Sequence, residues 1–376
     1  MTTALPPLKL GPIAVDPPVV LAPMAGVTNV AFRRLCRTYG AGLYVSEMVT
    51  ARALVEGNPK TMGMAAFGDD EPVRSVQLYG VNPAVMRSAV RRLVNEIGVD
   101  HIDLNFGCPA AKVTRRGGGA ALPVHRNLLR RIIAAAVDAA GSVPVSTKFR
   151  IGVDDDHTTY LETGRIAEGE GAVAVALHAR TAEQLYSGSA DWQAIAALKE
   201  EVTTIPVLGN GDILEASDAL AMVSATGCDG VVVGRGCLGR PWLFRDLADA
   251  FAGRPLSAPP GLGEVARIMH THATYLCDTF GDEYGIRQFR KHTSWYLTGF
   301  PVGPEVRRSM ATISSPEELD RILDRLDGTV PFPPGAARMA RGHTNGPRPV
   351  HLPAGWLETV DDPTPPEGAE ELVSGG

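Results

Sequence analysis

The residue that the sequence places best for chemistry is Cys108, which lies between Gly107 and Pro109 directly after the apolar run 99–105. A turn of this composition points the thiol outward from the end of the run. A thiol with a reference pKa near 8.5 is mostly protonated at neutral pH, so it can act as a nucleophile or as a proton donor. The five cysteines are widely spaced and form no Cys-x-x-Cys pair, which argues against a disulfide framework and a structural zinc site.

Two further apolar runs, 143–149 and 172–178, each contain one ionisable side chain, Lys148 and His178. Burying a lysine ammonium is costly unless an anion or an acceptor faces it. A Schiff-base lysine and a lysine that hydrogen-bonds an electron-rich cofactor ring are both open, as is a lysine that simply extends to solvent. His178 is equally compatible with a buried core histidine and with a functional one.

Two glycine-containing turns indicate a phosphate-bearing ligand. They are Gly209-Asn210-Gly211-Asp212 and Gly234-Arg235-Gly236, and each follows an apolar run. Glycine lets backbone N–H groups approach a phosphate closely, and the start of a following helix strengthens that attraction. Arg235 can add a charge-assisted hydrogen bond. One such turn would be explained by a tight connection alone, whereas two in consecutive units favour a phosphate site.

These residues need a scaffold that brings the ends of several strands together. Short apolar runs alternate with segments of helical period. The runs are 19–24, 43–48, 73–79, 99–105, 143–149, 172–178, 205–209 and 230–234. Runs that are apolar throughout fit strands of a parallel sheet covered on both faces. Eight βα units predict an α/β fold, a (β/α)₈ TIM barrel of about 250 residues with its reacting groups at the carboxyl ends of the strands. A doubly wound open sheet is the alternative, but no Gly-x-Gly-x-x-Gly follows the first run.

The pattern divides the chain into parts. Residues 1–251 hold the barrel pattern, and the stretch 252–263, with three prolines and three glycines, is typical of a linker. Residues 264–327 show only helical periods, with a helix start at Ser315-Pro316, and predict a small all-helical domain. Proline, glycine and charged residues dominate 328–376, where we expect a mostly disordered tail with an acidic end.

Composition limits the classes of protein. Hydrophobic residues make up 44% and charged residues 21%, as in a globular protein with a sizeable core. No run approaches the roughly 18–20 apolar residues that span a bilayer, and no signal-peptide layout begins the chain, so we expect a cytoplasmic protein without a membrane partner. His270 and His272 do not share a helical face, and we expect no metal site.

The distribution of charge matters more than its sum. The net charge is −6, which by itself argues against a nucleic-acid partner. Six acidic residues and no Lys or Arg fall within 353–376, so the remaining chain is neutral overall. A neutral body can still carry a basic face.

Several segments of the barrel pattern combine into a specific signature. They are Leu21-Ala22-Pro23-Met24-Ala25-Gly26-Val27-Thr28-Asn29 with Phe32-Arg33, Ser46-Glu47-Met48, Val76-Gln77-Leu78-Tyr79-Gly80, Asp103-Leu104-Asn105-Phe106-Gly107-Cys108-Pro109, Gly209-Asn210-Gly211-Asp212-Ile213 and Gly234-Arg235-Gly236. Together they resemble the bacterial, FMN-dependent tRNA-dihydrouridine synthase family over about residues 15–325. The segment around Cys108, with Gly117-Gly118-Gly119 downstream, is highly specific in this combination. Asn29 stands where aspartate is usual, and Asn caps a helix as well as Asp does.

This resemblance implies an enzyme with an FMN-binding barrel and a helical tRNA-binding domain. The enzyme would reduce the C5–C6 double bond of uridine in tRNA, with NADPH or NADH as reductant. Hydride would pass from flavin N5 to C6, and Cys108 would supply the proton to C5. The residues implied to bind FMN are Pro23, Met24, Ala25, Gln77, Lys148, His178, Asn210, Gly211, Asp212, Gly234 and Arg235. Asn105, Arg150 and Arg180 are candidates for the uracil edge.

The helical domain supplies the argument for an RNA partner. Between residues 287 and 308 there are five basic residues and one acidic residue. Arg287, Arg290 and Lys291 share one helical face by their spacing, and we expect that face to meet tRNA phosphates. The aromatic residues between them are better explained as core. The target uridine must leave its stack to reach a flavin in the barrel. We expect a monomer.

Two alternatives remain at this stage. An FMN barrel could act on a small unsaturated substrate such as a free pyrimidine, but such an enzyme has no use for a basic helical domain. The chain could instead be an RNA-binding or folding-assisting protein with a vestigial flavin site, although Cys108, Lys148 and both phosphate turns are intact.

Overall fold

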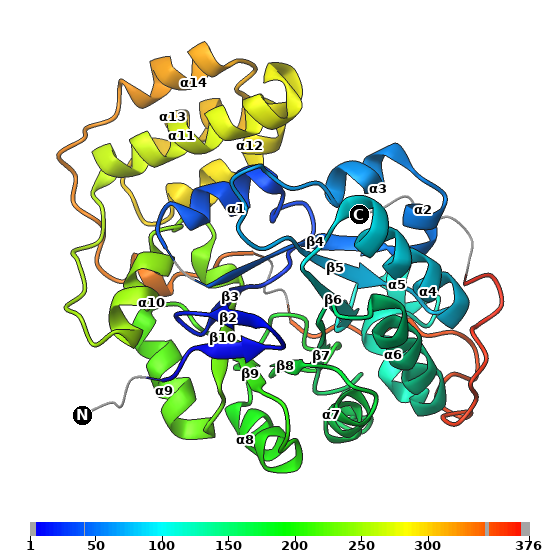
Figure 1. Cartoon of the computed structure of the whole chain (residues 1–376). Helices are drawn as coiled ribbons and strands as arrows, with labels where there is room; N and C mark the ends of the chain where they lie inside the picture. The colour runs from blue at the N-terminus through cyan, green and yellow to red at the C-terminus, as the bar shows by residue number, and fades with distance from the viewer. Residues whose placement is uncertain (1–4, 41, 343–345, 370–376) are drawn as a thin grey trace.

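The computed structural model describes residues 5–40, 42–342 and 346–369. A closed barrel of parallel strands forms its centre, in the order β10-β3-β4-β5-β6-β7-β8-β9 (Figure 1). The strands are β3 (Val19–Leu21), β4 (Leu43–Thr50), β5 (Ser75–Tyr79), β6 (His101–Phe106), β7 (Val145–Arg150), β8 (Ala174–His178), β9 (Val207–Asn210) and β10 (Gly230–Val233). Each lies within one of the predicted runs or extends it by one or two residues. The predicted TIM barrel is confirmed, and the open sheet is excluded because β10 pairs with both β9 and β3.

Helices follow the strands and cover the outside of the barrel. They are α1 (Val30–Arg37), α2 (Ala51–Val55), α3 (Pro59–Met64), α4 (Pro83–Arg92), α5 (Ala111–Thr114), α6 (Arg126–Ala140), α7 (Tyr160–Gly169), α8 (Trp192–Glu201), α9 (Ala216–Thr226) and α10 (Leu243–Phe251). Helix α4 continues as a π-helical turn to Ile97. Asn29 caps α1 as expected, since its Oδ1 accepts the Phe32 N–H at 3.0 Å.

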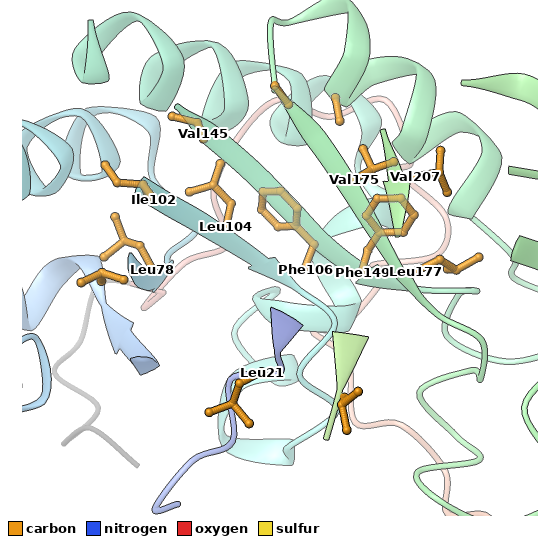
Figure 2. Close-up of a cluster of buried hydrophobic side chains, with 14 of the residues drawn as sticks. Leu21, Leu78, Ile102, Leu104, Phe106, Val145, Phe149, Val175, Leu177 and Val207 are labelled. Atoms are coloured by element: carbon orange, nitrogen blue, oxygen red, sulfur yellow. The ribbon is translucent and has the colours of Figure 1, made fainter. Parts of the chain in front are cut away.

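The main core lies between the strands and these helices. Figure 2 shows it around β6 and β7, where Ile102, Leu104, Phe106, Val145 and Phe149 gather with side chains of the neighbouring strands. Burying each such side chain contributes about 1.5–3 kcal/mol. This layer holds the strand ends in a fixed arrangement around the barrel mouth.

The prediction that the runs are apolar throughout is wrong for β6. Ile102, Leu104 and Phe106 belong to the outer core, whereas the alternate residues His101, Asp103 and Asn105 are buried polar groups. Successive side chains of a strand point to opposite faces, so the second set points into the barrel. The barrel interior is therefore polar on the β6 side.

A short hairpin that the sequence analysis did not predict closes the end of the barrel where the strands begin. Its strands β1 (Leu8–Leu10) and β2 (Ile13–Val15) are antiparallel. Leu8, Leu10 and Val15 pack with inward-facing side chains of the barrel such as Val20 and Leu208. The hairpin thus fills the barrel interior at the end where the strands begin, and Asn105, near the other end of β6, lies toward the carboxyl ends of the strands.

A helical domain follows the barrel, as expected. It consists of α11 (Leu262–Phe280), α12 (Asp282–Tyr296), α13 (Gly303–Thr312) and α14 (Pro316–Leu323). Ser315 caps α14, because its Oγ accepts the Glu318 N–H at 3.2 Å. The core of this domain includes Ala31 and Leu35 of α1, so the two domains share a packed interface (Figure 1). Within the described residues, no helix is both long and apolar enough to cross a membrane.

The described residues of the tail include side chains packed on the barrel, whereas the sequence predicted a mostly disordered segment. Trp356 is buried against the main core, and Arg341 is buried near the barrel mouth. Residues 343–345 and 370–376, which include the acidic Glu370 and Glu371, lie outside the described residues. A composition rich in proline, glycine and charged residues predicted disorder, but a few apolar side chains suffice to hold the tail on a surface that the barrel already provides.

Candidate active site

A cavity of about 430 Å³ opens at the carboxyl ends of the barrel strands. Its lining includes residues that the sequence analysis assigned to a flavin or to its substrate: Pro23, Met24, Ala25, Gln77, Asn105, Cys108, Lys148, Arg150, His178 and Arg235. An adjoining recess of about 80 Å³ shares several of these side chains and adds Asn210, Gly211, Asp212 and Gly234. The fold therefore brings every predicted cofactor residue to one connected space.

Cys108 lies in a turn that is held from several directions. Asn105 Oδ1 accepts the N–H groups of Gly107 at 3.0 Å and Cys108 at 2.9 Å. Arg150 Nε donates to the Gly107 carbonyl at 2.9 Å, and the Ala120 N–H donates to the Cys108 carbonyl at 3.0 Å. Burial raises the pKa of the Cys108 thiol above its ordinary value, although Arg150 and Lys112 oppose this. The thiol is thus protonated at neutral pH and faces the cavity.

A chain of side-chain hydrogen bonds runs from this turn into the barrel. Asn105 Nδ2 donates to Gln77 Oε1 at 2.7 Å, and Gln77 Nε2 donates to Asp103 Oδ2 at 2.7 Å. Ser146 Oγ donates to the other carboxylate oxygen at 2.6 Å. Because backbone N–H groups can only donate, Asn105 must present its oxygen to the turn, and every amide below it is then oriented.

Asp103 and Ser146 were missed by the sequence analysis, although Asp103 lies in the signature around Cys108. Burial raises the pKa of Asp103, while hydrogen bonds from Ser146 and Gln77 and the charge of Lys148 lower it. The signal that could have found Asp103 is the polar residue at every second position of β6. Treating that strand as uniformly apolar concealed it.

Lys148 and His178 place one cation and one neutral ring at the cavity. Burial, assisted by Arg150, lowers the pKa of Lys148 to about 8. Among the described residues its ammonium has no hydrogen-bond partner, and it lines both the cavity and the recess. Burial and the nearby cations lower the pKa of His178 well below its usual value, so the ring is neutral. A half-buried ammonium without a protein acceptor leaves room for an acceptor on a bound molecule.

The recess is built from the two glycine turns. A Cβ at Gly236 would lie 2.0 Å from the Ile213 carbonyl oxygen, and one at Gly211, whose φ is +134°, would lie 2.7 Å from Ala190 Cβ. Only glycine fits these close approaches. At Gly234 a Cβ would meet nothing closer than 3.5 Å, so its backbone is open to the recess. Arg235 begins the short 3₁₀ turn that follows, and its side chain supplies a cation there.

The Asp212 carboxylate is engaged by protein groups. It accepts hydrogen bonds from Arg180 Nη2 at 2.8 Å and from the Ala190 N–H at 2.7 Å. Arg235 Nη2 lies 3.6 Å from it. Asn210 likewise donates from Nδ2 to the Val232 carbonyl at 2.7 Å. These hydrogen bonds fix the two side chains and shape the recess.

The two candidate arginines for the uracil edge occupy different places. Arg150 lines the cavity, and its Nη1 also donates to the carbonyls of Thr181 and Leu185 at 2.8 and 2.9 Å. Arg180 is only 1% exposed, does not line the cavity, and donates to the carbonyls of Ser187 and Gly188. Both arginines hold the loop that follows β8.

That loop presents Tyr186, a residue the sequence analysis did not select. Its ring lines both the cavity and the recess, with the guanidinium carbons of Arg235 and Arg150 at 4.4 and 5.6 Å from its centroid. Trp295 of α12 and Arg341 of the tail also line the cavity. No local pattern marks these residues, because long-range packing alone brings them to the mouth.

The three basic residues predicted to meet tRNA phosphates do not form one exposed face. Arg287 is exposed and lies 3.9 Å from Glu283. Arg290 donates from Nε to the Ile313 carbonyl at 2.7 Å. Lys291 is half-buried and points toward the barrel, since a Cβ at Gly26 would lie 3.5 Å from its Nζ. The RNA contacts of all three stay predictions, but the position of Lys291 favours a role at the barrel over contact with a phosphate.

The residues present fit a flavin mononucleotide. The glycine-lined recess with Arg235 suits a phosphate, and the Lys148 ammonium suits the electron-rich edge of the ring. The cavity, whose lining includes Met24 and Cys108, suits a planar group. Within the described residues, no group of three or more His, Cys, Asp or Glu is arranged to hold a metal ion.

Comparison with known proteins places this site in context. A model of the family described as dihydrouridine synthase matches residues 20–330. A probable tRNA-dihydrouridine synthase of Mycobacterium tuberculosis is 59% identical over 380 residues, covering 99% of this chain and 97% of that protein. The corresponding Mycobacterium leprae protein is 56% identical over 95% of this chain and 100% of its own length. A tRNA-dihydrouridine synthase B of Pseudomonas syringae pv. tomato is 43% identical over 80% of this chain and 88% of its own length.

Proposed function

The chain belongs to the dihydrouridine synthase family, and from that premise we propose that it is an FMN-dependent tRNA-dihydrouridine synthase. It reduces the C5–C6 double bond of uridines in tRNA, with NADPH or NADH as the electron source. The observation that carries the proposal is that the Cys108 thiol and Lys148 line one cavity, which adjoins the glycine-lined recess.

FMN bound here would supply the hydride for C6 of the uracil ring. The chain supplies the other requirements. Cys108 donates the proton to C5, for which its raised pKa keeps the thiol protonated. Asn105 and Arg150 fix the Cys108 turn, and Lys148, which lines the cavity and the recess, would offer a positive charge to the bound flavin.

The cavity and the residues around it support tRNA as the substrate. The uridine must be turned out of its stack to reach the cavity, and Trp295 and Arg341 stand at the cavity as an aromatic ring and a cation beside its path. We assign residues 1–251 to catalysis and residues 264–327 to tRNA binding, with Arg287 the exposed cation on α12. A tRNA substrate fits a cytoplasmic location.

The test separates the two half-reactions. The purified protein should release FMN on denaturation. Cys108→Ala should retain FMN and be reduced by NAD(P)H at the normal rate, while reoxidation by unmodified tRNA slows by about 10²–10⁴-fold, the usual worth of general acid catalysis. Cys277→Ala, a half-buried cysteine in α11, is the matched control and should behave as wild type.

Three results would contradict the proposal. One is a protein that neither contains nor takes up FMN. Another is equal slowing of both half-reactions in Cys108→Ala, which would assign Cys108 a structural role. The third is reoxidation by free uridine as fast as by tRNA, which would favour a small-molecule reductase.

A further inference from the structure

The C-terminal tail lies outside the segment that matches the family, which ends at residue 330. Within the tail, residues 346–369 run along the barrel beside α6 (Figure 1). Leu352, Leu357 and Val360 pack against the main core. The tail therefore covers a specific surface of the barrel, and that surface includes the back of the loop that follows Cys108.

Trp356 anchors the tail there. The side chain is 5% exposed, its ring stacks on His125 with centroids 3.5 Å apart and an interplanar angle of 14°, and its Nε1 donates to the Ala121 carbonyl at 2.8 Å. The ring also packs on Gly117: a Cβ there would lie 2.6 Å from Trp356 Cη2. Trp356 thus contacts both ends of the segment 117–125.

The opposite side of that segment contacts Cys108. A Cβ at Gly119 would lie 2.4 Å from the Cys108 carbonyl oxygen and 3.1 Å from Cys108 Cβ. The neighbouring Ala120 N–H donates to the same carbonyl at 3.0 Å. One short segment therefore lies between the proposed proton donor and the tail, in direct contact with each.

Polar contacts fix the tail relative to this segment. His125 Nε2 lies 2.8 Å from the Trp356 carbonyl oxygen. The Arg126 N–H at the start of α6 donates to the Val360 carbonyl at 3.2 Å, and Arg126 Nε lies 2.7 Å from Asp361 Oδ1. The tail carbonyl satisfies an N–H that the helix start leaves unpaired. These bonds give the tail a single register on the barrel.

We propose that the tail is a positioning element for Cys108 and that Trp356 is the residue through which it acts. Inside the barrel, Asn105 holds the Cys108 turn by its N–H groups. From outside, Trp356 holds the segment that packs behind the turn, so the thiol is fixed from two sides. The reaction invoked is the one proposed above, and the tail adds no chemical step to it.

The experiment compares Trp356→Ala, Trp356→Phe and Phe332→Ala in the full-length, FMN-loaded protein. Phe332 is the matched control, because it is an aromatic residue of the C-terminal region that packs on Trp242 and Phe300 in the helical domain. Alkylation of Cys108 by iodoacetamide, followed by mass spectrometry with Cys277 as internal reference, reports how tightly the thiol is held. Flavin reduction by NAD(P)H and reoxidation by tRNA are measured in parallel.

Trp356→Ala should raise the alkylation rate of Cys108 by roughly tenfold, because local opening exposes the thiol. It should slow reoxidation by tRNA by about 10–100-fold, since small misplacement of a reacting group is costly, and leave flavin reduction unchanged. Trp356→Phe keeps the ring and should restore most of both values. Phe332→Ala should change neither, even if it lowers the melting temperature equally.

Wild-type alkylation and reoxidation rates in folded Trp356→Ala would overturn the proposal and make the tail a surface cover only. If Trp356→Ala does not fold, Trp356→Leu, which keeps apolar volume, is judged by the same two rates. Failure of the proposed function is distinguishable: wild-type enzyme would then not be reoxidised by tRNA, while the alkylation comparison would still decide whether the tail holds Cys108.

Discussion

The polar groups of the barrel mouth are buried and hydrogen-bonded, whereas those of helix α12 include an exposed charge. At the mouth, Asn105, Gln77 and Asp103 are buried and bonded in a fixed direction. On α12, Arg287 is exposed, with Glu283 the acidic group nearby at 3.9 Å. A buried, fully bonded network has one arrangement and is expensive to disturb, whereas an exposed charge contributes little and adds independently. The proposed chemistry and the proposed RNA contact therefore fall in regions of different physical character.

The largest expected effect comes from removing Asp103, at the inner end of the buried hydrogen-bond network. Asp103→Ala leaves Gln77 Nε2 and Ser146 Oγ without their acceptor, so the amides above can turn and the Cys108 turn loses its fixed partner. We expect reoxidation by tRNA to slow by about 10²-fold. Stopped-flow absorbance of the flavin measures it.

Asp103→Asn is the matched control for that substitution. Its Oδ1 can still accept from Gln77, and its amide can donate to Ser146 once the hydroxyl turns around, so we expect a loss of no more than about tenfold. Equal rates in Asp103→Ala and wild type would show that the network does not position Cys108.

A smaller effect should appear in the dependence of FMN binding on pH. The pKa of Lys148 is lowered to about 8, so its ammonium is charged below that pH and neutral above it. Binding of FMN to the apoprotein should weaken as pH rises through about 8, by roughly five- to tenfold, the difference between a charged and a neutral hydrogen bond. Quenching of flavin fluorescence between pH 7 and 9.5 measures it, above the second pKa of the phosphate.

Lys148→Met provides the control for the pH series. It should bind FMN more weakly at pH 7 and show a flat profile through pH 8, because the titrating group is gone. A wild-type profile that is equally flat would remove Lys148 from the flavin contacts.

The smallest expected effect concerns α12. Arg287→Ala should lower the slope of log K against log salt for tRNA binding by about one unit, because one exposed phosphate contact is lost. Lys291→Ala should leave that slope unchanged, since the lysine faces Gly26 at the barrel and donates to Gln288 Oε1 at 2.6 Å. Binding titrations at several salt concentrations measure both, and a slope change in Lys291→Ala alone would reverse the assignment.

The sequence predicted what local pattern encodes. Each barrel strand was predicted because a short apolar run between turn residues is typical of a buried strand. The glycine turns at the ends of β9 and β10 were recognised because only glycine permits their close approaches. Asp103 was missed because β6 was treated as apolar throughout, although its polar residues recur at every second position. Tyr186, Trp295 and the β1–β2 hairpin could not be foreseen, since their neighbours are set by packing across the fold. Composition misdirected the prediction for the tail, because Trp356 uses a core that another part of the chain supplies.

The pairing of β3 with β10, which closes the barrel, joins strands that are synthesised at very different times. Val19 of β3 pairs with Val231 of β10, so the first barrel strand emerges from the ribosome long before its last partner exists. At about 5–20 residues per second the interval is roughly 10–40 s. Throughout that time one edge of β3 is unpaired and the growing sheet is open, a condition that favours association with other chains. The yield of this protein in a cell therefore depends on how well that nascent edge is shielded, and substitutions in β3 or β10 are expected to reduce soluble yield out of proportion to their effect on the finished fold.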